Sequence, residues 1–352
     1  MTFGRSALEW CVLKQVHPKM NGANDTDAVA FVVIGRNEGK RLLASLRSVL
    51  AVSSQAVYAD SASVDGSPDL ARSLGIVVVD LSSGRLNAAR GRNEGLAAVR
   101  EHFPNARLIQ FLDGDCILEP AWPRAAAAFL NDHPNVAVVC GRRYEARPQA
   151  SFYNLIADEE WNTPIGPCDA CGGDSMMRLE ALNAAGGFDP ELMAGEEPEL
   201  CGRLRALGWK IWRLDCPMTE HDANIMRFGE WWRRVVRSGF GYAQVWHRCS
   251  RASRPSSLAP QLRSAIFWVV LVPIGTIIAA VLFRQAAFML AIPIAYAVQL
   301  VRIGSRRRGS ASFRLRSSGL VMIAKVAELA GALRYVLSPE YNQPIEYKNN
   351  PN

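Results

Sequence analysis

The chain has 352 residues, of which 49% are hydrophobic and 21% charged, and its formal net charge is +7. This length suits roughly two domains of about 150 residues, and the composition excludes a disordered or fibrous chain. The arginines concentrate between Arg233 and Arg316, beside the most apolar stretches, which favours a membrane surface over a nucleic acid. No zinc-finger spacing or aromatic RNA-binding motif is present, so we expect no nucleic-acid partner.

The N-terminal half alternates short apolar runs with amphipathic segments. The first 28 residues are polar and do not resemble a secretory signal, so the globular part is expected in the cytoplasm. Strands are expected at 29–34, 56–59, 76–79, 108–112 and 136–140, and helices at 41–50, 67–74, 87–100 and 122–130. This alternation predicts an α/β fold with a mostly parallel, doubly wound sheet, whose ligands bind beyond the carboxyl ends of strands.

The segment after the fifth strand is harder to interpret. Residues 142–172 look irregular and aromatic, followed by a helix at 180–185, a helix that begins near Pro198 and a strand at 210–214. The eight cysteines are too sparse for a disulfide scaffold, and the CxxC at 168–171 lacks a second pair. Reduced structural thiols are therefore favoured over zinc or redox chemistry.

The C-terminal part changes character. Residues 265–283 carry no charge and are about as long as a bilayer-spanning helix of ~20 residues, and 286–301 form a second apolar run. Arginines flank the pair on both outer sides, so the positive-inside rule places both flanks in the cytoplasm. The alternative is a pair of buried core helices. Residues 320–337 are apolar but carry charges, which fits an interfacial helix.

Two acidic segments are candidate sites. Asp113 and Asp115 follow the strand at 108–112, and this spacing alone allows either an acidic turn or a metal site. His221 is a lone histidine, usually structural, but an imidazole with two carboxylates would suit Mn²⁺ or Mg²⁺ holding a diphosphate. Glu196 and Glu197 begin a helix, where they are either capping charges or a general base.

The order of the motifs from residue 29 to about 242 resembles bacterial family 2 glycosyltransferases of the GT-A fold. Six segments carry the resemblance, in family order: VVIGRNEGKRL, YADSASVDGS, AARGRNEGL, FLDGDCILEP, GGDSMMRLEALNAAGGFDP and GEEPELCGRLRALGW. The resemblance implies a Rossmann-like domain that binds a nucleotide-diphosphate sugar.

On the donor side, the resemblance implies contacts to the nucleotide sugar from Glu38, Asp60, Arg92 and Asp113. It implies a Mn²⁺ or Mg²⁺ ion held by Asp115, Asp113 and His221. The family often has a second aspartate where this chain has Ser61, which leaves the nucleotide base open.

On the acceptor side, Glu197 occupies the place of the family's aspartate base, with Glu196 as the neighbouring alternative. Asp174 would lie near the acceptor. Trp231 and Trp232 would face the acceptor at the headgroup level, or else pack within a surface helix. The processive Gln-x-x-Arg-Trp motif is absent, which favours transfer of a single sugar.

These observations predict an inverting, metal-dependent glycosyltransferase that serves cell-envelope or exopolysaccharide biosynthesis. Its acceptor would be a hydroxyl of a lipid-linked saccharide or a saccharide, at the inner (cytoplasmic) membrane. The expected organisation is a polar segment (1–28), a catalytic domain (29–245), a basic linker (246–262), a transmembrane hairpin (263–303) and a basic loop with an interfacial helix and tail (304–352). Two alternatives stay open: a haloacid-dehalogenase-like phosphotransferase or phosphatase with Asp113 as nucleophile, and a non-catalytic nucleotide-sugar binder.

Overall fold

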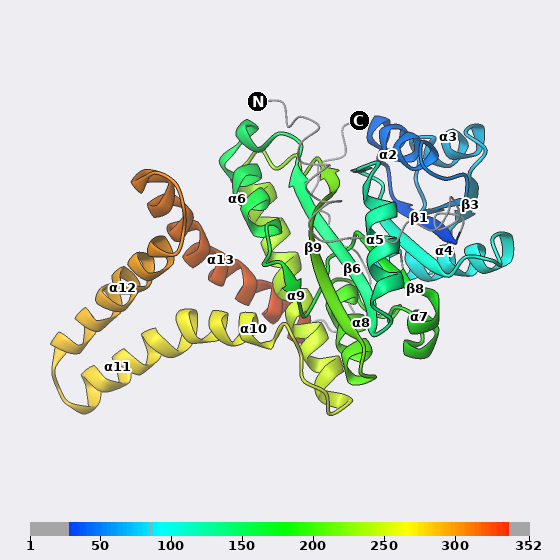
Figure 1. The fold of residues 1–352 in the computed structure, drawn as a ribbon. Coiled ribbons are helices and arrows are strands. Elements are labelled where there is room, and N and C mark those ends of the chain that lie inside the picture. The colour runs from blue at the N-terminus through cyan, green and yellow to red at the C-terminus, as the bar shows by residue number, and fades with distance from the viewer. Residues whose placement is uncertain (1–27, 85, 338–352) are drawn as a thin grey trace. The chain divides into compact units, whose positions relative to one another are not determined.

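The computed structural model describes residues 28–84 and 86–337 (Figure 1). The predicted polar N-terminal segment lies almost entirely outside this range, as does the C-terminal tail. The described chain divides into two compact units, one that ends at Met226 and one that begins at Arg227. Each unit is described by itself below.

The first unit is built on a nine-stranded sheet of order β3-β2-β1-β4-β8-β6-β9-β5, with β7 paired to β9. The strands are β1 Val29–Gly35, β2 Ala56–Asp60, β3 Val77–Asp80, β4 Leu108–Asp113, β5 Cys116–Leu118, β6 Val136–Glu145, β7 Gly166–Pro167, β8 Ser175–Arg178 and β9 Lys210–His221. Parallel pairs join β3, β2, β1 and β4, whereas β8 runs antiparallel between β4 and β6. The predicted α/β fold is confirmed, with a sheet that is more mixed than expected.

Helices cover both faces of this sheet. They are α2 Lys40–Leu50, α3 Ser67–Ser73, α4 Ala88–His102, α5 Trp122–Asp132, α6 Phe152–Trp161, α7 Leu179–Ala185 and α8 Glu196–Ala206, with a 3₁₀ turn at Pro148–Ala150. Phe31 and Val33 of β1 enter a core shared with α2 and α5, while the alternate residues Val32 and Ile34 enter a core shared with α4 and α8. A strand buried on both sides needs apolar residues throughout, which explains the unbroken run in β1.

Strands β6 and β9 extend beyond their predicted ends. The expected ends were residues 140 and 214, but β6 continues to Glu145 and β9 to His221. Their pairing shifts register around Cys140 and Arg142, so the regular alternation of side chains is interrupted there. Residues 142–172, predicted to be irregular, therefore contain the end of β6, all of α6 and β7. His221 is therefore the last residue of β9.

The second unit is entirely helical within the described residues. Its helices are α9 Phe228–Arg251, α10 Ala259–Ile266, α11 Val272–Leu282, α12 Ala291–Ser305 and α13 Ala311–Leu337, with a π-helical segment at Phe267–Leu271 and a 3₁₀ turn at Ala286–Leu290. The predicted domain boundary at residue 245 falls inside α9. The predicted linker 246–262 is accordingly the end of α9, a turn and the start of α10.

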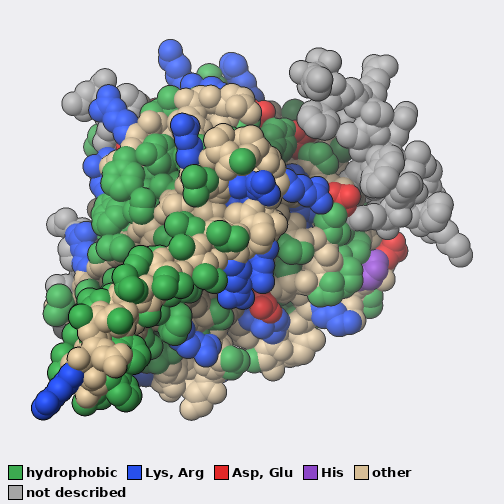
Figure 2. All heavy atoms as spheres, turned by 90° about the vertical axis from the view of Figure 1, so that its left-hand side faces the viewer, with side chains coloured by type: hydrophobic (Ala, Val, Ile, Leu, Met, Phe, Trp, Pro, Cys, Tyr) green, Lys and Arg blue, Asp and Glu red, His purple; other side chains and the backbone are tan. Residues whose placement is uncertain are grey.

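Two continuous helical stretches are long and apolar enough to cross a membrane. They are Ala259–Leu282 and Ala286–Ser305, and only 6% and 0% of their most apolar windows is buried. Core helices of a soluble domain would be mostly buried, so the alternative of two core helices is not supported. Figure 2 shows broad hydrophobic areas on this side of the molecule, with Lys and Arg side chains beside them and few acidic ones.

Helices α9 and α13 cross at two glycines. A Cβ added to Gly239 of α9 would lie 2.0 Å from the carbonyl oxygen of Glu328, and one added to Gly331 of α13 would lie 2.0 Å from that of Val236. Such close backbone contact excludes any side chain at either position. Helix α13 was predicted as an interfacial helix starting at 320, but it starts at Ala311 and buries one face on α9.

Candidate active site

The loops that follow β1 and β2 are joined by two hydrogen bonds. The N–H of Asn37 donates to Ser63 Oγ at 2.8 Å, and Asn37 Oδ1 accepts from the N–H of Val64 at 2.8 Å. Asp60, at the end of β2, is buried and accepts from Tyr58 Oη and from the N–H of Ser63, each at 2.7 Å. Burial and the neighbouring Asp60 carboxylate raise the pKa of Tyr58, so its hydroxyl remains a donor. Asp60 is therefore held by two hydrogen bonds at the carboxyl end of β2.

Glu38 lies in the loop after β1, at the same end of the sheet as Asp60. Its carboxylate pairs with Arg41 at 2.7 Å, and its Cγ would lie 3.4 Å from a Cβ added to Gly114, the residue after β4. Gly114 in turn donates its N–H to the carbonyl oxygen of Ile34 at 2.7 Å, and its added Cβ would be 3.0 Å from that oxygen. The glycine between the two aspartates is thus required for packing against β1.

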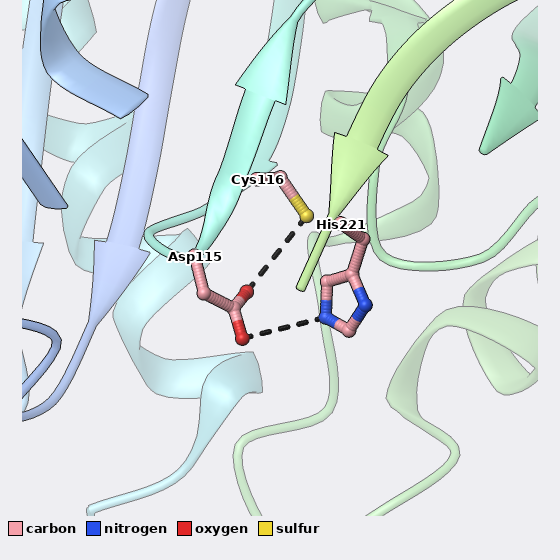
Figure 3. A group of neighbouring side chains, drawn as sticks. All are labelled: Asp115, Cys116 and His221. Carbon is pink, nitrogen blue, oxygen red and sulfur yellow. Dashed lines mark hydrogen bonds and ion pairs between the residues drawn. The ribbon is translucent and has the colours of Figure 1, made fainter. Parts of the chain in front are cut away.

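The two aspartates around Gly114 have different surroundings. Asp115 is 7% exposed, and its Oδ2 lies 3.3 Å from Nε2 of His221 (Figure 3). Among the described residues, donor atoms of Asp115, Cys116 and His221 lie within 4.8 Å of one another, whereas Asp113 clusters with Cys116 and Asp174. Of the three predicted metal ligands, the structure brings Asp115 and His221 together and places Asp113 in a neighbouring cluster.

The chemistry of His221 fits a divalent ion. Burial, followed by the nearby Arg143 guanidinium, lowers its pKa to about 4, so the imidazole is neutral near pH 7. Its Nδ1 is buried without a hydrogen-bond partner in the described part of the chain. A neutral imidazole beside a carboxylate suits Mn²⁺, and Mg²⁺ is held by carboxylates with phosphate oxygens. Burial raises the pKa of Cys116 well above its usual value, so this thiol remains protonated and is a poor ligand for such hard ions.

Asp174 contacts residues of three strands, β4, β6 and β9. It has no exposed surface; its Oδ1 accepts the backbone N–H of Asp113 at 2.9 Å and its Oδ2 accepts Thr219 Oγ1 at 2.9 Å. Arg143 Nη2 pairs with the same Oδ2 at 2.8 Å. The sequence suggested an acceptor contact, but a carboxylate buried and occupied in this way instead ties the end of β4 to β9.

Arg143 and Trp161 are site residues that the sequence did not indicate. Arg143 reaches Asp174, lies 3.7 Å from Asp113 and stacks over Trp161 at 5.7 Å from the ring centroid. Trp161 in turn meets the His221 ring edge-on, with centroids 4.7 Å apart. Both were hidden in the stretch predicted to be irregular. Because β6 continues past Cys140, Arg143 lies beside β9, close to His221.

Arg92 joins the acidic segment after β4 to the start of α8. It is 2% exposed, and its Nη2 donates to Asp113 at 2.9 Å while its Nη1 donates to Glu196 at 2.6 Å. The guanidinium also stacks over Phe188, 5.5 Å from the ring centroid. A planar guanidinium with several donors can hold two carboxylates at once, which an ammonium cannot do with the same geometry.

Glu197 is held differently from Glu196. Its Oε1 accepts the backbone N–H of Cys171 at 2.6 Å, the Cys171 thiol at 3.0 Å and the Cys201 thiol at 2.9 Å. Burial raises the pKa of Cys171 to about 11, so this thiol remains a donor. Both cysteines of the CxxC are free. The thiol of Cys171 thus orients the carboxylate at the N-terminus of α8.

The two tryptophans proposed for the acceptor side lie in the second unit, on α9. Trp231 is 2% exposed and packs near Phe228, with ring centroids 5.5 Å apart. A side chain buried to this extent cannot sit among lipid headgroups, so that expectation is wrong for Trp231. Trp232 is partly exposed and stays a candidate.

Comparison with known proteins identifies a family for part of the chain. Residues 30–176 match the model of glycosyl transferase family 2. The chain carries a family 2 glycosyltransferase domain. The chain is 24% identical over 269 residues to the succinoglycan biosynthesis protein ExoA of Rhizobium meliloti, covering 68% of this chain and 78% of ExoA. It is 25% identical over 210 residues to the O-antigen chain rhamnosyltransferase WbaN of Salmonella anatum, covering 56% of this chain and 64% of WbaN.

A solved structure is similar in fold to this chain. The mannosyltransferase PcManGT from Pyrobaculum calidifontis, in complex with GDP-Man and Mn²⁺, aligns with a TM-score of 0.56 at 17% identity. The alignment covers 88% of this chain and 87% of PcManGT. At this identity the likeness establishes the GT-A fold and says nothing of the substrate.

Proposed function

We propose that this glycosyltransferase moves a single sugar from a nucleotide-diphosphate sugar to a hydroxyl group of a lipid-linked saccharide or a saccharide, with inversion at the anomeric carbon. The relatives ExoA and WbaN, named for succinoglycan and O-antigen synthesis, support a role in cell-surface polysaccharide synthesis. The two apolar helices support an acceptor at the cytoplasmic membrane, with the first unit on its cytoplasmic side.

The bridge made by Arg92 supports this proposal most directly. It holds Asp113, at the end of β4, and Glu196, at the start of α8, in one ion-pair network around the buried guanidinium of Arg92. The segment expected to bind the donor is thereby fixed next to the helix expected to supply the base. An inverting transfer needs these two groups in one place, because the base and the leaving diphosphate act on opposite sides of the same carbon.

Glu197 is the better candidate for the base. Glu196 Oε1 is already occupied by Arg92 Nη1 at 2.6 Å, so this oxygen is less free to meet an acceptor hydroxyl. Glu197 receives a backbone N–H and two neutral thiols on one oxygen, and no hydrogen bond to its other oxygen is found within residues 28–84 and 86–337. That second oxygen would take the proton from the acceptor hydroxyl as the hydroxyl attacks the sugar.

Asp115 and His221 would hold the divalent ion. When bound, a divalent ion of this kind supplies a Lewis acid for the negative charge on a departing diphosphate. Arg143 lies beside both Asp113 and Asp174 and can add a charge-assisted hydrogen bond to a diphosphate oxygen. Glu38, in the loop after β1, and Asp60, at the end of β2, would contact the nucleoside.

The two rival functions are less well supported. A phosphatase nucleophile at Asp113 would need a free carboxylate, but Asp113 is paired with Arg92 and lies near Arg143. A non-catalytic binder would have no use for the carboxylate that two thiols orient at the start of α8.

A donor screen tests the proposal. The full chain in detergent is mixed with nucleotide sugars that differ in base and sugar, with and without Mn²⁺, and its thermal unfolding is followed. We expect one donor class to raise the unfolding temperature, and Mn²⁺ to increase the rise. Asp115→Asn should lose the metal-dependent part and keep the rest. If no donor shifts the wild type while Mn²⁺ is present, the proposed function is wrong.

A further inference from the structure

A basic pocket lies between the two candidate membrane helices of the second unit. Its volume is about 600 Å³, and its lining includes Arg263, Phe267, Trp268, Arg302, Arg306 and Arg307. This volume is within the range of ligand sites in proteins, about 300–1,000 Å³. No aspartate or glutamate lines the pocket. Four arginines without a lining carboxylate form a site for an anion.

The pocket lies at one end of the hairpin. Arg263 is near the start of the stretch Ala259–Leu282, and Arg302 is near the end of Ala286–Ser305. The two helices run in opposite directions, so these ends would meet the same surface of a bilayer. A pocket there faces lipid headgroups, at the depth where arginine side chains are favoured.

The walls of the pocket also suit an apolar tail. Phe267 and Trp268 pack edge-on within the lining, with ring centroids 5.2 Å apart. Beyond Trp268 along the same helix the exposed side chains are apolar, with Leu271 55% and Ile274 50% exposed. Figure 2 shows such hydrophobic areas next to Lys and Arg side chains. A ligand with an anionic head and a hydrocarbon tail would satisfy both parts, whereas a soluble anion would leave the apolar walls uncovered.

The number of arginines indicates the charge of the lipid headgroup. A phosphodiester headgroup carries one negative charge, while a terminal phosphate carries about −1.5 to −2 near pH 7 and offers three acceptor oxygens. One guanidinium can donate two parallel hydrogen bonds to two phosphate oxygens. We propose that this pocket binds a membrane lipid that ends in a phosphate or diphosphate. The inference rests on the membrane hairpin of the proposed function. Because the phosphate of a lipid-linked saccharide is esterified at both ends, the ligand proposed here is a free lipid phosphate or diphosphate, distinct from the acceptor saccharide.

Lipid binding to the full chain in a neutral detergent tests the proposal, with native mass spectrometry as the readout. Phosphatidic acid has a terminal phosphate, and phosphatidylglycerol has a phosphodiester. We expect phosphatidic acid to bind about tenfold more tightly, as one additional charge-assisted contact would give. The double variant Arg302→Gln with Arg306→Gln should lose this preference. The matched control, Arg308→Gln with Arg316→Gln, removes two exposed arginines that do not line the pocket and should keep it.

Three results would overturn the proposal: equal affinity for the two lipids, an equal loss in the control variant, or full displacement of the lipid by inorganic diphosphate. The last would assign the pocket to a soluble anion. Reconstitution of the wild type into neutral phosphatidylcholine vesicles, followed by alkaline extraction, tests the hairpin separately. A chain that stays in the vesicles but shows no preference for phosphatidic acid refutes the pocket alone, and a chain that is extracted refutes the membrane part of the proposed function.

Discussion

Substitution of Asp174 by asparagine tests whether a buried carboxylate holds the site together. Asparagine keeps the shape of the side chain and an oxygen that can accept the N–H of Asp113, but it removes the charge that pairs with Arg143 at 2.8 Å. The side chain of Asp174 is 0% exposed and that of Arg143 is 16% exposed, so the variant leaves a largely buried guanidinium without its nearest carboxylate.

The expected cost follows from this burial. Breaking a buried ion pair by removing one partner costs about 3–5 kcal/mol. The lower end, about 3 kcal/mol, applies here because Arg143 remains 3.7 Å from Asp113. For a unit of about 200 residues, each kcal/mol lowers the unfolding temperature by about 2–4 °C, so we expect a decrease of about 6–12 °C.

Thermal unfolding of the full chain in detergent, followed by tryptophan fluorescence, measures the effect. The matched control is Asp132→Asn, which removes an exposed carboxylate from the end of α5 in the same unit and should change stability by less than about 0.5 kcal/mol. Sugar transfer should also fall in Asp174→Asn, since Asp113 loses part of its support. If Asp174→Asn unfolded at the same temperature as the control and kept full activity, our interpretation of Asp174 as a positioning residue would be refuted.

Three further predictions concern the metal site, the Arg92 bridge and the helix crossing. His221→Ala should weaken Mn²⁺-dependent donor binding about 10-fold or more, measured by calorimetry, because the imidazole is lost beside Asp115; unchanged affinity in the presence of Mn²⁺ would contradict its role. Arg92→Lys keeps the charge but cannot hold Asp113 and Glu196 together, so kcat/KM should fall about 100-fold with stability less affected; a variant with wild-type kinetics would show that the bridge is dispensable. Gly239→Ala places a methyl group 2.0 Å from a backbone oxygen of α13 and should destabilise the second unit by about 1–3 kcal/mol, whereas Gly319→Ala, with no atom within 4 Å, should not; equal unfolding temperatures for the two variants would argue against the close crossing.

The parts of the fold that were predictable are those with a strong local signal. β1 and β4 are unbroken apolar runs because both of their faces are buried, and Asp60 and Asp113 follow from strand ends in a parallel arrangement. The two apolar stretches of the hairpin were predictable for the same reason, since composition and length alone set them apart.

The rest depends on contacts between segments that are distant in the sequence. Arg143 lies on an extension of β6 that carries polar residues and shifts register, so no periodicity indicated a strand there. The burial of Trp231 and the glycine crossing of α9 and α13 depend on how helices pack, which an amphipathic pattern does not specify. The thiols around Glu197 come from two segments, and only the fold brings Cys171 and Cys201 together, with sulfur atoms 3.8 Å apart.

Turnover by two glutamate variants is the most direct test of the proposed mechanism. Each full-length variant, with Mn²⁺ and a donor identified by the screen, is given membrane lipid extract as acceptor, and transfer of labelled sugar is measured together with donor affinity. We predict that Glu197→Gln binds the donor as the wild type does but transfers no sugar, because it lacks the proton acceptor. Glu196→Gln should retain measurable transfer. Transfer by Glu197→Gln at a rate near that of the wild type, together with its loss in Glu196→Gln, would contradict the assignment of the base.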